Sequence, residues 1–142
     1  MKYYDENGKE VIIPDNVLEK EVRREGFATV YRCNDDLCFK RYDSGITLND
    51  NFLKTSIYED LKNIKHFNLV DIKKLLYEDK TYQYMADAYI LSYYEEIYND
   101  FLEIPSEYLL YNMEKMLELI KKISAYKIRL HDLKRDNIIL TE

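Results

Sequence analysis

The sequence has no tryptophan and only two cysteines, three glycines and two prolines among its 142 residues. So little glycine and proline excludes a collagen-like or Gly/Ser-rich chain. Two cysteines are too few for the disulfide framework of a small secreted domain, and they suit a reducing compartment. Apolar runs are short, as in Ala88–Leu91, whereas a membrane-spanning helix needs about 20 apolar residues. We therefore expect no membrane partner.

The sequence also lacks an excess of basic residues. Its 21 lysines and arginines are outnumbered by 27 acids, which gives a net charge of −6. A chain this acidic is unsuited to binding nucleic acid through the phosphate backbone. The start, Met1–Glu6, carries no apolar leader segment. Together these features predict a soluble, cytoplasmic protein with no nucleic-acid partner.

The composition is otherwise that of a globular domain, with 46% hydrophobic and 34% charged residues. A chain of this size can bury a true core. Tyrosine is unusually common, at 15 residues. A base-stacking surface would need basic residues among the aromatics, but here tyrosines stand among acids, as in Tyr93–Glu96. Frequent Tyr, Lys, Ile and Asn instead favour an A/T-rich genome, as in a low-GC bacterium.

Hydrophobic periodicity predicts a strand-rich first half and a helical second half. Asn7-Gly8 marks the turn of a hairpin over Lys2–Pro14. One helix is expected after the third of the main strands, with a buried stripe of Leu53, Ile57, Leu61 and Ile64 at helical spacing. This order indicates an α+β fold. The predicted strands are 18–22, 27–33, 37–42, 69–76 and 81–89, and the predicted helices are 52–65 and 106–126, with a short helix or loop at 93–101.

The second helix is expected to begin at Ser106, which can cap it. Its apolar stripe is predicted to comprise Leu109, Met113, Met116, Leu117, Ile120 and Ile123.

The segment from His131 to Leu140 carries the strongest chemical signal, D-L-K-x-x-N followed by apolar residues. Phosphoryl transfer to a hydroxyl needs a carboxylate to orient the acceptor, an amide oxygen for Mg²⁺ and a cation near the γ-phosphate. Asp132, Asn137 and Lys134 supply these three types. Taken alone, the same segment also fits a charged turn between two short strands.

This spacing resembles the catalytic loop of protein kinases, and three further segments support the resemblance. Gly26–Tyr31 is similar to the second half of the phosphate-covering loop and the strand after it. Cys38-Phe39-Lys40 is similar to the A-x-K element of the third strand, and Lys65–Val70 to the bend after helix αC. The resemblance implies a kinase-like N-lobe in residues 1–91 and a partial C-lobe in 92–142, with an αE-like helix and the catalytic loop.

The resemblance also implies the roles of site residues, with ATP and Mg²⁺ as ligands. Asp132 would be the catalytic base, Lys134 a γ-phosphate ligand and Asn137 a ligand of Mg²⁺. Lys40 would contact the α- and β-phosphates, and Gly26 would belong to the phosphate-covering loop. The nucleotide-binding residues would be Gly26, Val30, Cys38, Lys40 and Met85, with Val30 and Cys38 against the adenine and Met85 near the hinge.

Several positions depart from the kinase pattern. Gly26 stands alone where the family has three glycines, and Leu130-His131 replaces the usual His-Arg. On a helical wheel Glu59 faces away from the apolar stripe of 52–65, while Asp60 lies on its flank, so either acid is a candidate partner for Lys40 or part of a solvated face. Only five residues follow Asn137, too few to reach a D-F-G.

Three functions follow from these observations. The first is a protein kinase-like domain whose ancestral reaction is ATP-dependent phosphorylation of protein Ser/Thr, with no appreciable turnover expected from these 142 residues. The second is a pseudokinase that acts as a non-catalytic binding module. The third is a fragment of a small-molecule phosphotransferase of the aminoglycoside or choline kinase type. Helix 106–126 is expected to bind a protein partner or a second copy.

The two cysteines raise one alternative of a different kind. Cys33 and Cys38 are close enough in sequence to be considered as a metal pair. Two thiols without further ligands are too few for a structural zinc site.

Overall fold

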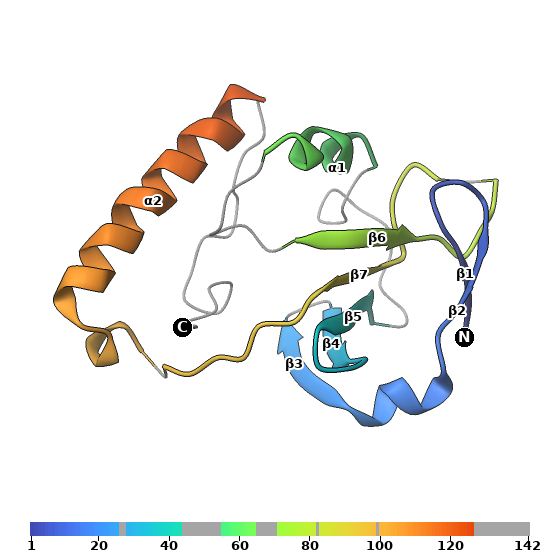
Figure 1. Cartoon of the computed structure of the whole chain (residues 1–142). Coiled ribbons are helices and arrows are strands. Elements are labelled where there is room, and N and C mark those ends of the chain that lie inside the picture. Colours follow the sequence, from blue (N-terminus) through green and yellow to red (C-terminus); the bar gives the residue numbers. More distant parts are fainter. Residues whose placement is uncertain (26–27, 44–54, 65–70, 82, 99, 127–142) are drawn as a thin grey trace. The chain divides into compact units, whose positions relative to one another are not determined.

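The computed structural model describes residues 1–25, 28–43, 55–64, 71–81, 83–98 and 100–126 (Figure 1). Within these residues the protein has a five-stranded antiparallel sheet, a two-stranded sheet and two α-helices. The α+β class predicted from the sequence is confirmed. The chain forms two compact units, residues 1–58 with 71–93, and residues 59–70 with 94–142. The predicted division into 1–91 and 92–142 differs from this mainly because it placed residues 59–70 in the first part, whereas they belong to the second unit.

The five-stranded sheet belongs to the first unit, and all its neighbouring strands are antiparallel. β3 and β6 are its edge strands, and β5 is its centre. In spatial order the strands are β3 (Glu21–Glu25), β4 (Ala28–Arg32), β5 (Leu37–Tyr42), β7 (Ala88–Ser92) and β6 (Ile72–Leu76).

Helix α1 (Thr55–Lys62) follows β5 in the chain, and β6 and β7 come after it. This is the order predicted from the sequence: three strands, a helix, then two strands. The predicted buried stripe of this helix needs a correction. Tyr58 is its buried residue, whereas Ile57 and Leu61 are only partly buried. The buried face is therefore rotated towards Tyr58.

The hairpin predicted at the N-terminus is present, as β1 (Lys2–Tyr4) and β2 (Glu10–Ile12), followed by the 3₁₀ helix η1 (Asp15–Glu19). Its turn is longer than two residues, because Asp5 and Lys9 close it. The Asp5 carboxylate accepts hydrogen bonds from the backbone N–H of Asn7 and Lys9, both at 2.9 Å. Gly8 has a φ of 77°, a conformation that favours glycine.

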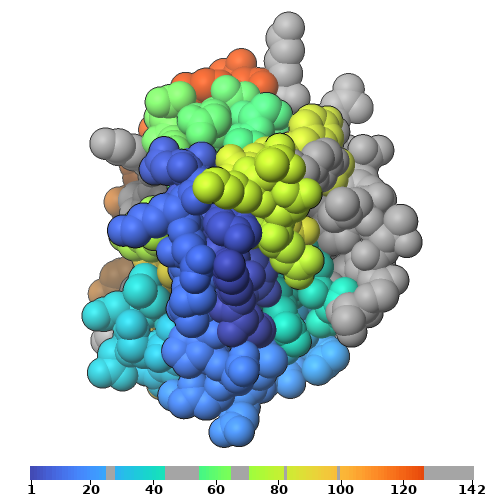
Figure 2. Space-filling view, turned by 90° about the vertical axis from the view of Figure 1, so that its right-hand side faces the viewer, coloured from blue at the N-terminus to red at the C-terminus, as the bar shows by residue number. Residues whose placement is uncertain are grey.

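The hairpin is also bonded to the main sheet of the same unit. Tyr4 and Tyr77 exchange backbone hydrogen bonds of 2.7 and 2.8 Å, and Gln83 Nε2 donates to the carbonyl of Asp5 at 2.9 Å. Figure 2 shows the blue N-terminal segment beside the yellow-green segment that follows β6. The N-terminal hairpin is therefore attached to the main sheet of its unit and does not stand apart from it.

A core cluster fills the space between this hairpin and one face of the sheet. Phe39, fully buried on β5, stands at its centre, with ring centroids 5.8 Å from Tyr3 and 6.2 Å from Tyr31. The buried members of this cluster are Tyr3, Ile13, Val17, Tyr31, Phe39, Leu76 and Ala88.

The strand predicted over 81–89 begins seven residues later, at Ala88. Polar side chains bind the preceding backbone and keep it out of the sheet. Asp79 accepts hydrogen bonds from both the N–H and the hydroxyl of Thr81, and Asp87 accepts one from the N–H of Glu78. Such short-range bonds stabilise turns in competition with strand pairing. The connection from β6 to β7 is thus a long loop.

Helix α2 (Ser106–Ala125) lies in the second unit and confirms the predicted helix 106–126. It follows Pro105, and Ser106 is its first residue rather than its cap. Its buried residues are Leu119 and Ile123, which pack with Ile64. Leu119 was not in the predicted stripe. In the part of the chain that the structure describes, no helix is both long enough and apolar enough to cross a bilayer.

Replacing Phe39 by Ala should destabilise the first unit by about 3–5 kcal/mol, because it removes a fully buried ring and leaves a cavity. Urea denaturation followed by circular dichroism measures this change. Leu102→Ala is the matched control, since Leu102 is exposed and its loss should change stability by less than about 0.5 kcal/mol. Equal effects of the two substitutions would contradict this position of the core.

Asp5 should make the stability of the hairpin pH-dependent. The backbone N–H of Lys9, with that of Asn7, lowers the pKa of the Asp5 carboxyl. The charged form therefore stabilises the fold above the unfolded pKa of about 3.9, and this contribution is lost as pH falls through the folded pKa. In thermal melts, wild type should exceed Asp5→Asn in Tm at pH 7, and the difference should shrink below pH 4. A constant difference across this range would refute the assignment.

Candidate functional site

The register of three central strands places Lys40 between two partners on one face of the sheet. Val30 of β4 lies directly opposite Lys40 of β5, and Lys40 lies directly opposite Tyr89 of β7. Side chains directly opposite each other in antiparallel strands project from the same face. Val30 is buried, whereas Lys40 is partly exposed. Two of the predicted nucleotide-binding residues are thus neighbours.

Cys38 lies two residues before Lys40 and therefore on the same face. It stands opposite Arg32 of β4 and Leu91 of β7. The Cys38 thiol is buried and is within 3.7 Å of the Leu91 carbonyl oxygen and 3.8 Å of the Ser92 carbonyl oxygen, as a weak donor. Val30, Cys38 and Lys40, which we call the lysine face, therefore lie together on one face of the sheet.

A tyrosine ring lies beside the lysine of this face. The Lys40 Nζ lies 5.6 Å from the centroid of the Tyr89 ring. Tyr42, two residues beyond Lys40 on the same face, meets Tyr89 edge to face at 6.3 Å between centroids. A cation over an aromatic face is stabilised by about 0.5–1 kcal/mol where water reaches it. The ring therefore helps to hold the ammonium group near the sheet.

Arg32 anchors the segment that leaves the sheet after β7. Its guanidinium carbon lies 4.3 Å from the centroid of the Tyr93 ring, and it also contacts Asp35 at 3.4 Å. The N–H of Tyr93 donates to the carbonyl of Asp36 at 2.8 Å. Tyr93 is the last residue of the first unit, so these bonds fix the point from which the chain passes to the second.

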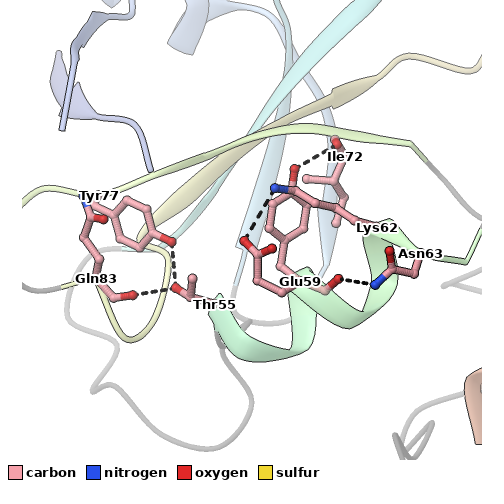
Figure 3. Close-up of polar contacts among 8 residues, drawn as sticks. Thr55, Glu59, Lys62, Asn63, Ile72, Tyr77 and Gln83 are labelled. Atoms are coloured by element: carbon pink, nitrogen blue, oxygen red, sulfur yellow. Dashed lines mark hydrogen bonds and ion pairs between the residues drawn. The ribbon is translucent and has the colours of Figure 1, made fainter. Parts of the chain in front are cut away.

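The beginning of helix α1 is fixed to the same unit by hydroxyl groups (Figure 3). The Thr55 hydroxyl lies 2.7 Å from the Tyr77 hydroxyl and donates to the carbonyl of Gln83 at 2.6 Å. The Tyr58 hydroxyl donates to the carbonyl of Ile72 at 3.4 Å. Tyr58 also packs with Leu75, Tyr77 and Ala86 in a second apolar cluster.

Glu59, one of the two acids considered for Lys40, is bonded within its own helix. Its carboxylate lies 3.5 Å from the Lys62 Nζ, and both side chains are exposed (Figure 3). The Glu59 carbonyl accepts a bond from the Asn63 side chain at 3.2 Å. Asp60 is partly exposed. The exposed Glu59 side chain fits the second of the two alternatives considered above, an acidic face in contact with solvent.

β3 and β4 flank the segment that the sequence predicts as a phosphate-covering loop. Glu25 pairs with Ala28, so only Gly26 and Phe27 separate β3 from β4. Gly26 itself lies outside the described residues. Arg24, one of the two cations near this turn, is engaged by Glu21, with Nε and Oε1 3.1 Å apart. The Glu21 carboxylate raises the pKa of that guanidinium still further.

Met85, predicted to lie near the hinge, stands in the loop before β7 and is partly buried. The chain passes from the first unit to the second eight residues later, between Tyr93 and Tyr94. The three predicted catalytic residues, Asp132, Lys134 and Asn137, all lie outside the described residues. The geometry of the site therefore comes from the lysine face alone.

Cys33 and Cys38 project from opposite faces of the sheet. Cys33 packs against the core cluster around Phe39, whereas Cys38 stands on the lysine face. Both are free thiols, and burial raises the pKa of the Cys33 thiol. Within the described ranges, no three His, Cys, Asp or Glu residues are grouped as a metal site would require. Within the described residues, the two cysteines therefore do not share a metal site.

Tyr89 and Leu91 were missed as members of this face. Their alternation in Ala88–Ser92 is visible in the sequence, but the strand was placed too early in the chain. With a strand that begins at Ala88, the alternation of side chains places Tyr89 and Leu91 on one face. In the structure Tyr89 is opposite Lys40, and Leu91 is opposite Cys38.

The face combines apolar side chains with one partly exposed ammonium group. This chemistry suits an anion that carries an apolar part. Comparisons add no relative: no family model matches the chain, and no curated protein and no solved structure resembles it significantly.

The two thiols should react at different rates in the native protein. Cys33 is partly exposed and Cys38 is buried, so maleimide should modify Cys33 first, as measured by mass spectrometry of the peptides. Because the Cys33 pKa is raised, its rate should still be rising above pH 9, beyond an ordinary thiol pKa of about 8.5. Unfolding in urea, the control, should equalise the rates. Faster modification of native Cys38 would contradict the two-face arrangement.

Proposed function

We propose that this chain is a protein kinase-like domain that binds ATP on the lysine face. The observation that carries the proposal is the register that sets Val30, Cys38 and Lys40 side by side. Apolar side chains suit a purine ring, and a lysine on a flexible stem suits phosphate oxygens. In this proposal Val30 and Cys38 contact the adenine and Lys40 contacts the α- and β-phosphates.

The order of elements supports the same proposal. In protein kinases the phosphate-binding lysine lies on the third strand, and helix αC follows. Lys40 lies on the third strand of the five-stranded sheet in chain order, and α1 follows it. We infer that α1 corresponds to αC and α2 to the αE-like helix.

The hinge belongs, in this proposal, at Ser92–Glu95 rather than at Met85. A hinge joins the two lobes, and the chain leaves the first unit after Tyr93. The Arg32–Tyr93 contact and the bond from the Tyr93 N–H to Asp36 would hold this segment beside Cys38, where an adenine edge needs backbone donors and acceptors.

The proposed chemistry is transfer of the γ-phosphoryl group of ATP to a protein Ser/Thr hydroxyl. Asp132 would orient that hydroxyl and accept its proton, and Lys134 would neutralise charge on the transferred group. Asn137 would supply an oxygen ligand to Mg²⁺, which neutralises the phosphates when bound. These three roles rest on the sequence motif, since the residues lie outside the described part of the chain.

A non-catalytic pseudokinase is the second candidate, and one contact favours it. Catalysis in kinases uses an ion pair between the strand lysine and a glutamate of αC. Glu59, one of the two acids considered for that role, pairs with Lys62 on its own helix. A domain with this arrangement would bind nucleotide or a protein partner without turning over.

ATP binding tests the proposal directly. With ATP and Mg²⁺ at about ten times Kd, the wild-type Tm should rise by about 4 °C. Lys40→Met should abolish the shift, because it keeps the stem but removes the charge. Lys74→Met is the matched control, since Lys74 pairs with Ile90 on the other face of the same sheet, and it should keep the shift.

Two results would overturn ATP binding on the lysine face: no shift of wild type at about 10 mM ATP, or equal shifts of wild type and Lys40→Met. If ATP binds, phosphate transfer to a generic protein substrate that is lost in Asp132→Asn would favour the enzyme. Binding without transfer would agree with the lack of turnover expected for these 142 residues and with the pseudokinase.

A further inference from the structure

Helix α2 is apolar on two adjoining faces, and among the described residues of its unit only one of them packs in a core cluster. Leu119 and Ile123 are buried and pack with Ile64, with Leu61 at the margin. This contact accounts for one face of the helix. The neighbouring face of the helix takes no part in this cluster.

The second face carries large apolar side chains that are well exposed. Leu110 is 62% exposed, Met113 54% and Leu117 60%. Ile120, partly buried, continues the series. The spacings between these four residues are three, four and three. Ser106 lies four residues before Leu110, and Ser124 lies four residues after Ile120. Such alternation is the pattern of residues that face another helix in a coiled coil. We call Leu110, Met113, Leu117 and Ile120 the outer stripe.

Three charged residues border the outer stripe at intervals of seven. Glu107 lies near the start of the helix, Glu114 at the middle and Lys121 near the end. On a helical wheel all three fall within about 60° of Leu110, on the same side of the stripe. The border is therefore acidic at one end of the helix and basic at the other.

The other charges in the second half of α2 are bonded to one another. Glu118 lies 3.3 Å from the Lys115 Nζ and 3.6 Å from the Lys122 Nζ. By contrast, Glu107, Glu114 and Lys121 take part in no ion pair with any residue that the structure describes. The charges beside the outer stripe are thus the ones left for a partner.

We propose that the outer stripe binds α2 of a second copy of this chain, with the two helices antiparallel about a two-fold axis near Glu114. Leu110 of each copy then meets Ile120 of the other, and Met113 meets Leu117. Glu107 of each copy meets Lys121 of the other, twice by symmetry. In a parallel pair the two charged borders would lie on opposite sides of the seam and could not meet, so only the antiparallel arrangement brings Glu107 against Lys121.

The pairing is expected to be weak. Four apolar residues from each copy form a contact at the low end of specific interfaces. The two copies of Glu114 also approach each other near the axis, which opposes association. We expect a dimer with a Kd of about 100 μM rather than a permanent one. The inference does not depend on ATP binding, because it involves none of the residues of the lysine face.

Sedimentation velocity of the full chain between about 10 μM and 1 mM tests the proposal. Wild type should pass from monomer to dimer in this range. Glu107→Lys and Lys121→Glu should each weaken dimerisation about tenfold, because each replaces two attractive pairs by two repulsive ones. The double variant E107K/K121E should restore it. An equimolar mixture of the two single variants should also dimerise, since both pairs are then attractive again.

The control is Lys122→Glu, which reverses a charge that is bonded to Glu118 away from the stripe, and it should leave the dimer unchanged. Circular dichroism of each variant confirms that α2 is folded. A wild type that stays monomeric at 1 mM would overturn the proposal, and it would favour coverage of the stripe by residues of the same chain. Dimerisation that neither the double variant nor the mixture restores would exclude the antiparallel pairing.

Discussion

Backbone pairing of β5 with β4 on one side and β7 on the other is the constraint on which the first unit depends. The pairing fixes which side chains share a face, so it decides at once where Phe39 and Lys40 lie. Phe39 enters the core beneath the N-terminal hairpin, and Lys40 projects from the opposite face. A slip of one residue would exchange the two and place an ammonium group in the core, where an unpaired charge is costly.

This constraint explains why the core and the candidate site are adjacent in sequence yet separate in space. Cys38-Phe39-Lys40 alternates between the two faces, so the stabilising ring lies between two residues of the lysine face. The same alternation holds on β7. Tyr89 lies on the face of Lys40, and its neighbours Ala88 and Ile90 pack with the core on the other face. Stability of the sheet and geometry of the face are therefore set by the same hydrogen bonds.

The order of elements could be predicted from the sequence because it rests on local periodicity. The bounds 37–42 for β5 and the start of α2 at Ser106 agree with the structure. The start of β7 could not be predicted, because Asp79 and Asp87 bind nearby N–H groups in competition with strand pairing. The deep burial of Tyr58 depends on Leu75 and Tyr77 from distant parts of the chain, and helical spacing alone favours Ile57.

In the candidate site, short motifs within one strand were enough to select Val30, Cys38 and Lys40, whereas neighbours that depend on pairing between strands were missed. Val30, Cys38 and Lys40 came from short motifs, while Tyr89 and Leu91 required the register of β7. The catalytic-loop residues stay a prediction.

The exchange of backbone bonds between Tyr4 and Tyr77 has a consequence for the solution behaviour of the sheet. Edge strands carry unpaired backbone groups that can recruit a strand from another molecule. Beyond Leu76, the path of edge strand β6 is occupied by the hairpin. The opposite edge, β3, carries Glu21, Arg23 and Arg24, and desolvating such charges opposes strand addition. The hairpin thus takes up the backbone groups of Tyr77, where an added strand would otherwise continue past the end of β6.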